Sequence, residues 1–387
     1  MKAADQRKPS PNRQHRRTVP VAVQTGMLAV VGAVVLTASL SGCGGPSGGG
    51  QGSKATSPSA APSSGQAQYK VAATIPVGKG PGGVAVDPAT HTVYVGNLDS
   101  DSGDGSLIVI DGSKRSVTAT VPVGKHAGAV AVDPGSHTVY VVNSTDNTVS
   151  VVEGGRNTVI ATVPVAPGPS SVAVDPGTHT VYVGSSDPNG GAGSVSVIDG
   201  STHAVTATVP VGKFAGEVAV DPGSHVVYAT NSGDDTMSLI DGSTHTVTAT
   251  MPVARWPKAV AVDPGTHIVY VATVDPETAP NDTQPPSRSG RVSVIDPSTR
   301  TVVATVSIGK DPDGLAVDPG THTIYVPKYA NDTLAVIDGS TRAVTVTGPL
   351  TGASLGHGVA VDPGTHTVYV TNFNDGTLSV IEPAGQR

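Results

Sequence analysis

The hydrophobic and polar positions of this chain follow one pattern that recurs along its length, and residues 129–165 show it in full. Four stretches rich in Val and Thr lie there, at 129–133, 137–143, 148–152 and 158–165, each followed by a turn-forming segment. Short Val- and Thr-rich stretches bounded by Gly, Pro, Asn, Asp and Ser predict β-strands. Each copy of the pattern therefore predicts four consecutive strands, which we name A to D.

The segment between strands A and B reads Asp-Pro-Gly-(Ser/Thr)-His in most copies, as at Asp133–His137. Proline fixes φ at the second position of such a turn, glycine accepts a positive φ, and the aspartate carboxylate accepts backbone N–H groups. Asp-Gly-Ser between strands C and D has the same properties. Both segments predict tight turns in an antiparallel sheet.

The repeat is visible in the tetrapeptide Ala-Val-Asp-Pro, which occurs seven times. Its prolines are 46, 42, 46, 42, 55 and 44 residues apart, at Pro88, Pro134, Pro176, Pro222, Pro264, Pro319 and Pro363. A four-stranded propeller blade takes about 40–45 residues. The sequence thus predicts an all-β fold, a seven-bladed β-propeller of four-stranded antiparallel blades, over residues 69–387.

The two ends of this region complement each other. Residues 71–77 match strand D, whereas the C-terminal residues 376–381 match strand C. The N-terminal strand is therefore predicted to complete the last blade, which closes the ring and removes an open sheet edge.

Tyr369-Val370-Thr371-Asn372 is the YVTN signature, and close variants begin at Tyr94, Tyr140 and Tyr228. On these residues the chain resembles the YVTN-repeat, YncE-like seven-bladed β-propeller proteins over 69–387. The blades containing Tyr182, Tyr270 and Tyr325 depart from the signature. The resemblance implies an exported or surface-attached protein but no single reaction; related propellers include lactonases and quinoprotein subunits, which keep an enzyme among the hypotheses.

The N-terminal region predicts export. Six basic residues precede an apolar stretch at about 26–40, which is shorter than the roughly 20 residues that span a bilayer. Leu40-Ser41-Gly42-Cys43 then resembles the bacterial lipobox, which implies a signal peptide over 1–42 and lipid attachment at Cys43, the only cysteine. Arg16-Arg17 leaves general secretory and twin-arginine export both open. Residues 43–68, rich in Gly, Ser, Pro, Ala and Gln, predict a flexible tether.

We expect a protein anchored to the cell membrane by lipid, on its extracytoplasmic side. From Cys43 onward the chain has 17 basic and 29 acidic residues, a net charge of −12. Such a balance argues against nucleic acid as a partner, because that binding neutralises phosphates with Lys and Arg. The partners left open are an envelope protein, a glycan or a small anionic ligand; we expect a monomer and no cofactor.

One histidine recurs in every unit, directly before strand B. A zinc site needs several ligand atoms about 2 Å from one point, whereas equivalent residues of different blades are spread around a ring. We therefore interpret these histidines, and the aspartates of Ala-Val-Asp-Pro, as turn residues. They are His91, His137, His179, His225, His267, His322 and His366.

The residues that break the repeat are better candidates for a site. In an antiparallel blade, the D–A and B–C loops open at one end and the A–B and C–D turns at the other. The D–A and B–C loops, and the positions beside them, contain three kinds of such residues. These are basic residues at one D–A position, other polar residues close by, and the non-repeated aromatics. A basic and aromatic surface at a channel mouth would suit an anionic ligand; alternatively, the lysines are solvated loop residues. The ligand-binding candidates are Lys79, Lys125, His126, Lys213, Phe214, Arg255, Trp256, Lys258, Lys310, Tyr329, His357 and Phe373.

Two loops are longer than their counterparts. Residues 98–106 contain Asp99, Asp101 and Asp104, a weak calcium candidate, because the third acid is out of EF-hand register and the distal Glu is missing. Residues 273–291 form the longest B–C insertion, either a partner-binding flap or a loop without function.

No sequence motif pairs a nucleophile with a base. The expected function is a non-catalytic binding or scaffolding module at the cell envelope, which acts through the D–A/B–C end. The alternative is a propeller enzyme, lactonase-like or quinone-dependent, with its site at the channel mouth. Its candidate residues are Glu217, Asp311, Asp313, His126 and His357. A third possibility is a structural spacer of the envelope.

Overall fold

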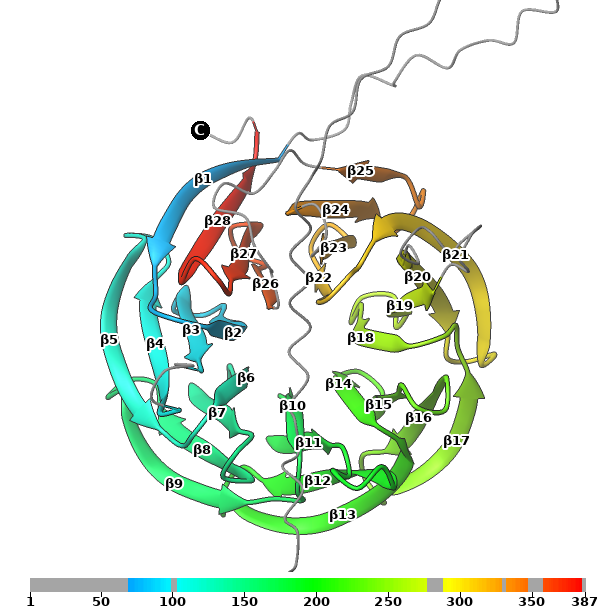
Figure 1. Ribbon diagram of the computed structural model, residues 1–387, viewed down its shortest axis with the longest axis horizontal. Helices are drawn as coiled ribbons and strands as arrows, with labels where there is room; N and C mark the ends of the chain where they lie inside the picture. The colour runs from blue at the N-terminus through cyan, green and yellow to red at the C-terminus, as the bar shows by residue number, and fades with distance from the viewer. Residues whose placement is uncertain (1–68, 99–102, 277–287, 329–331, 347–357, 385–387) are drawn as a thin grey trace, which may run out of the picture. The chain divides into compact units, whose positions relative to one another are not determined.

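The computed structural model describes residues 69–98, 103–276, 288–328, 332–346 and 358–384. These residues form seven four-stranded antiparallel sheets arranged in a ring (Figure 1). The fold is therefore the predicted seven-bladed β-propeller. The predicted signal peptide, Cys43 and the tether lie outside the described residues, and none of the described residues forms a helix able to span a membrane.

The first four blades follow one another along the chain. Blade 1 comprises β2 (Pro81–Asp87), β3 (Thr92–Asn97), β4 (Gly105–Asp111) and β5 (Ser116–Val123). Blade 2 comprises β6 (Ala127–Asp133), β7 (Thr138–Asn143), β8 (Thr148–Glu153) and β9 (Thr158–Pro164). Blade 3 comprises β10 (Pro169–Asp175), β11 (Thr180–Ser185), β12 (Ala192–Asp199) and β13 (Ala204–Lys213). Blade 4 comprises β14 (Ala215–Asp221), β15 (Val226–Asn231), β16 (Thr236–Asp241) and β17 (Thr246–Pro252).

The remaining blades include the one that closes the ring. Blade 5 comprises β18 (Pro257–Val262), β19 (Val269–Pro276), β20 (Arg288–Asp296) and β21 (Thr301–Lys310). Blade 6 comprises β22 (Ala316–Asp318), β23 (Thr323–Lys328), β24 (Thr333–Asp338) and β25 (Val344–Val346). Blade 7 comprises β26 (Val359–Asp362), β27 (Thr367–Asn372), β28 (Thr377–Pro383) and β1 (Tyr69–Pro76).

Blade 7 confirms the predicted closure. Strand β1, blue in Figure 1, is the outermost strand of that blade and pairs antiparallel with the red β28, from Tyr69 opposite Pro383 to Pro76 opposite Thr377. Ile75 and Val77 bury their side chains in a core shared with blade 1. The first described strand therefore joins the last blade to the first.

The hydrophobic core lies between neighbouring blades. Strands B and C are buried on both faces, as in β7, whereas strand D is mostly exposed, as in β9. The cluster around Tyr94 and Leu107 of blade 1 includes Val139 and Val141 of blade 2. Since each blade buries its Val-rich faces only against its neighbours, the ring is stabilised as a unit.

The repeated histidines and aspartates also connect neighbouring blades. Each His Nδ1 lies 2.7–2.9 Å from an Oδ2 atom of the Asp that begins the A–B turn of the preceding blade, for example His179 beside Asp133. The seven pairs include His91 with Asp362, across the closure between blades 7 and 1. The predicted role as turn residues is confirmed, since the Oδ1 atom of Asp133 accepts the N–H of Gly135. The contact between blades is the part that the sequence analysis missed.

Candidate functional site

The D–A and B–C loops meet at one end of the propeller, which we call the loop face. In blades 1 to 4 the carbonyl of the residue directly before strand A accepts a hydrogen bond from the first backbone N–H after strand B, and in blade 5 the carbonyl of Trp256 accepts one from the N–H of Val274, near the end of strand B. Phe214 O, for example, accepts from the N–H of Ser232, and His126 O accepts from the N–H of Ser144. These bonds fix the D–A loop against the B–C loop of the same blade. The predicted face therefore exists as one surface.

The residue that accepts this bond has a left-handed backbone in blades 1 to 5, and so does Asp311 in the D–A loop of blade 6. Its φ lies between 46° and 72°, and the residues are Gly80, His126, Gly168, Phe214, Trp256 and Asp311. Glycine adopts this conformation without steric cost, whereas residues with large side chains rarely do. Blades 1 and 3 have the favoured residue, and blades 4 and 5 have aromatic residues instead.

Phe214 and Trp256 line one groove on the loop face. Its volume is about 560 Å³, and it spans residues from blades 3, 4 and 5. Phe214 is 47% exposed and Trp256 is 44% exposed. The main side chains around this aromatic groove are those of Ser170, Ser186, Phe214, Ser232, Trp256 and Lys258. The structure thus brings together three of the predicted ligand-binding residues.

Hydrogen bonds from the serine hydroxyls hold the groove in place. Ser186 Oγ donates to the carbonyl of Ala215 at 2.7 Å, and Ser232 Oγ donates to that of Phe214 at 3.2 Å. Ser170 Oγ donates to Gly216 O at 3.3 Å. Because each hydroxyl donates its proton to the protein, its lone pairs can accept a hydrogen bond from a ligand.

The basic residues of the D–A loops are interspersed with acids on the loop face. Lys125, Lys213, Arg255 and Lys310 are exposed. The backbone N–H of Lys213 donates to Asp234 at 2.7 Å, and Arg255 Nε lies 3.9 Å from Asp235. The loop face therefore has both signs of charge.

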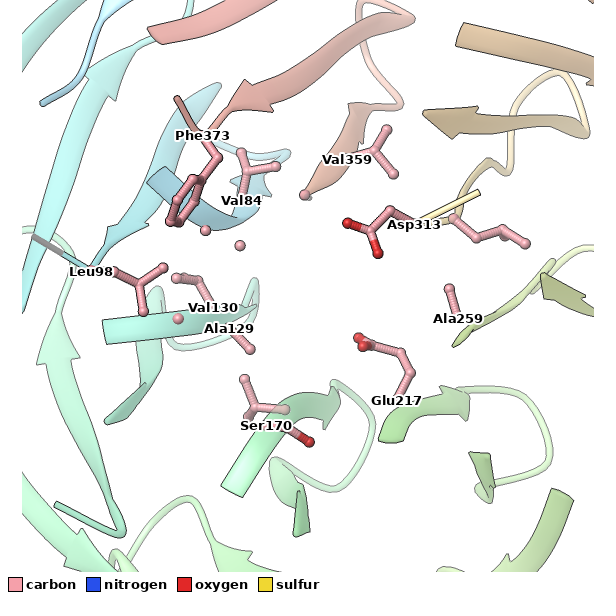
Figure 2. Close-up of a pocket in the computed structure, with 17 residues that line it drawn as sticks. Val84, Leu98, Ala129, Val130, Ser170, Glu217, Ala259, Asp313, Val359 and Phe373 are labelled. Atoms are coloured by element: carbon pink, nitrogen blue, oxygen red, sulfur yellow. The ribbon is translucent and has the colours of Figure 1, made fainter. Parts of the chain in front are cut away.

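A second hollow lies at the centre of the ring. This cavity of about 380 Å³ is lined by the glycine-rich starts of the A strands. Figure 2 shows Glu217 of blade 4 and Asp313 of the blade 6 loop directed into it, with Phe373 at its edge. Burial and the negative charge of Asp313 raise the pKa of Glu217 to about 7. Two of the residues predicted for an enzyme thus share one cavity.

The other predicted residues lie apart from these two hollows or outside the described residues. Lys79 lines a separate hollow beside Asn97 in blade 1. His126 Nδ1 lies 3.0 Å from Thr145 Oγ1 on the loop face, and Asp311 occupies the left-handed position of blade 6. Tyr329 and His357 lie outside the described residues. Both therefore stay predictions.

The two long loops are only partly described. Asp104 is exposed ahead of β4, whereas Asp99 and Asp101 lie outside the described residues, so the calcium prediction stays untested. In the insertion, strands β19 and β20 continue as a paired hairpin to Pro276 and Arg288. Arg291 lies 2.7 Å from Asp275 in an ion pair. The insertion therefore begins as an extension of blade 5.

Sequence analysis missed Lys328 as a candidate. It ends strand B of blade 6, where Asn143 and Asn372 of other blades donate to a Thr and a Ser of strand C. Lys328 is only 6% exposed, and this burial lowers the pKa of its amine. The signal was present in the sequence, because Tyr-Val-Pro-Lys replaces Tyr-Val-Thr-Asn.

No protein-family model and no curated protein matches this chain. Its fold, in contrast, recurs in many solved structures. A chain of Kuenenia stuttgartiensis hydrazine synthase superposes with a TM-score of 0.69 at 19% identity, over 80% of this chain and 97% of that one. At this identity the likeness establishes the propeller fold alone.

Proposed function

We propose that this protein is an exported, lipid-anchored β-propeller that binds a ligand of the cell envelope through its loop face. The aromatic groove is the observation that carries the proposal. It exposes two large aromatic side chains beside hydroxyls and an amine, and concave surfaces of this composition and volume are typical of ligand sites. A passive spacer would not need exposed aromatic residues at this position.

The location is proposed from the sequence. The lipobox resemblance ending at Cys43 supports attachment to the membrane, and residues 43–68 would act as a tether between the anchor and the propeller. The resemblance to YVTN-repeat, YncE-like proteins agrees with an extracytoplasmic location. In this arrangement the loop face can reach other components of the envelope.

One experiment tests the anchor. The wild-type chain and a Cys43→Ser variant are expressed in a bacterium supplied with labelled palmitate, and the cells are fractionated. We expect label and membrane association for the wild type and neither for the variant. Equal membrane association of both chains would contradict lipid anchoring.

A second experiment tests the binding surface. A photo-crosslinking residue replaces Lys213 on the loop face or Thr244 in the C–D turn at the opposite end, each in the full chain. After irradiation of intact envelopes, we expect a discrete crosslinked product from position 213 and none from position 244. Products that are equal from both positions would contradict binding through the loop face.

The central cavity favours a second candidate function, a propeller enzyme such as a lactonase-like hydrolase. The observation that favours it is that Glu217 and Asp313 line one cavity and that the pKa of Glu217 is raised to about 7. Such a carboxyl can exchange protons near neutral pH. If the protein is such an enzyme, it should hydrolyse at least one lactone of a test panel. The rate should change around pH 7, and Glu217→Gln should abolish the activity. Turnover that is unchanged in this variant would exclude Glu217 as the acid or base.

A further inference from the structure

We infer that the aromatic groove binds a pyranose ring bearing a carboxylate, as part of an acidic glycan, with Trp256 and Phe214 as stacking surfaces and Lys258 as the group that selects the charge. This inference rests on the proposed binding function and specifies its ligand. It starts from the backbone at the two aromatic positions.

Phe214 and Trp256 occupy a position that disfavours them. Their φ angles are 49° and 46°, and all other non-glycine residues with positive φ in the described part of the chain are His, Asn, Asp or Arg. A bulky residue in this region is strained, and glycine fills the same position in blades 1 and 3. Since both aromatics are nearly half exposed, burial offsets little of that strain. Strain retained at an exposed position indicates a role in binding.

The two rings leave room for a ligand. The ring of Phe214 lies over the Gly233 backbone, where a β-carbon would come within 2.5 Å of its Cδ2 atom. Phe214 and Trp256 keep 47% and 44% of their surface exposed, and both line the same groove. The groove of about 560 Å³ that they line therefore stays open between them.

The lining matches the chemistry of a sugar. A pyranose has apolar faces of C–H groups, which pack on aromatic rings, and hydroxyls around its edge, which need hydrogen-bond partners. Ser170, Ser186 and Ser232 already donate their protons to backbone carbonyls, so they can accept from sugar hydroxyls. A purely apolar ligand would offer no donor to the lone pairs of these oxygens.

Lys258 gives the charge preference. It is exposed beside the groove, at a position that glycine occupies in blades 1, 2 and 4. Among the described residues no carboxylate lies within ion-pair distance of its amine, so it can bind a carboxylate on the sugar. Asp235 and Asp234 are instead engaged by backbone N–H groups of Trp256 and Lys213.

The test titrates the detergent-solubilised full chain with trisaccharides of glucuronate, galacturonate and mannuronate and with their neutral counterparts. Trp256 is the only tryptophan, so its fluorescence reports on the groove directly. We expect saturable binding of at least one acidic trisaccharide, about tenfold tighter than its neutral counterpart. Lys258→Ala should remove this preference without preventing binding of the sugar.

Calorimetric titrations of variants separate a binding role from a structural one. Trp256→Gly and Phe214→Gly should each weaken binding at least about tenfold, and neither should lower the urea midpoint, because glycine relieves the strain. Trp256→Phe should retain most of the binding. His245→Gly, the same change at a left-handed position in the C–D turn at the opposite end, is the matched control and should leave binding unchanged.

Two results would overturn the inference. One is the absence of saturable binding to any of these trisaccharides while the loop face still crosslinks in envelopes, which refutes the glycan but not the binding function. The other is unchanged trisaccharide binding in Trp256→Gly and Phe214→Gly, which places the sugar elsewhere. Loss of both trisaccharide binding and crosslinking would refute the proposed function as well.

Discussion

The His–Asp pairs between blades make the most quantitative prediction of the structure. At the contact between blades 2 and 3, the Asp133 carboxylate is 1% exposed and its Oδ2 atom lies 2.7 Å from His179 Nδ1. The same carboxylate accepts the Gly135 N–H at 3.0 Å and the Ser136 hydroxyl at 2.8 Å. Removing the histidine takes away one bond to a buried charge, whereas removing the aspartate takes away three.

A hydrogen bond to a charged group contributes about 1.5–3 kcal/mol. Because the His179 side chain is 51% exposed, we expect the lower end, about 1.5 kcal/mol, for His179→Ala. Asp133→Ala also leaves the turn without its cap and should cost about 3–5 kcal/mol. The double variant should show a coupling of about 1.5 kcal/mol between the two residues.

The assay is urea unfolding followed by circular dichroism, with the free energy of unfolding obtained for each single variant and the double variant. His245→Ala is the matched control, because His245 has a similar left-handed backbone, with φ of 54° against 57° for His179. Among the described residues no carboxylate lies within ion-pair distance of its ring. The control therefore measures the cost of alanine at positive φ without the contact between blades.

The reasoning is refuted if His179→Ala costs no more than His245→Ala, or if the double-variant cycle gives no coupling. Either result would mean that the pairs are a consequence of the turn geometry. The free energy that holds the blades together would then come from the apolar contacts between them.

Three further predictions concern ionisation and ring closure. Because the pKa of Glu217 is raised to about 7 in the folded protein, its contribution to stability is present below about pH 4.5 and is lost as the pH rises through 7. Glu217→Gln should therefore raise the urea midpoint at pH 8 and leave it unchanged at pH 4. A lower midpoint for this variant at pH 8 would contradict the prediction. Burial raises the pKa of Tyr140, Tyr182, Tyr228 and Tyr369 to about 12. The free energy of unfolding should therefore fall as the pH rises from 10 through 12, and tyrosinate absorbance should appear together with unfolding. Tyrosinate absorbance of these residues near pH 10 in the folded protein would be inconsistent with their burial. Deleting residues 69–77 removes the buried side chains of Ile75 and Val77 and exposes the edge of β28. The free energy of unfolding should therefore fall by at least about 3 kcal/mol, and the protein should aggregate. A monomer with wild-type stability would refute closure by β1.

Much of the fold was predictable because it depends on local signals that recur. The Ala-Val-Asp-Pro turns gave the number of blades, and the match of residues 71–77 to strand D gave the closure that β1 makes with β28. The contact between His179 and Asp133 was not predicted, although both residues recur in every blade. Their pairing depends on the angle between neighbouring blades, which no local pattern specifies.

The candidate site was predictable only in part. The sequence placed Phe214, Trp256 and Lys258 on one face, and the structure brings them to one groove. It did not show that the aromatic position has a left-handed backbone, because that depends on the hydrogen bond that Phe214 O accepts from the N–H of Ser232 in the B–C loop. It named Glu217 and Asp313 among the candidates for an enzyme but did not show the raised pKa of Glu217, since that depends on burial and on the charge of Asp313, almost a hundred residues away in the sequence.

The central claim is that the loop face binds the cell envelope, and a comparison of two charge reversals tests it most directly. Lys213→Glu with Arg255→Glu alters the loop face, and Lys114→Glu with Arg156→Glu makes the same change of charge in C–D turns at the opposite end. Each full chain also contains Cys43→Ser, so that lipid does not contribute, and its Kd for isolated bacterial envelopes is measured by co-sedimentation. We predict binding about tenfold weaker for the loop-face variant and unchanged for the other. Equal Kd values for the two variants would contradict the account.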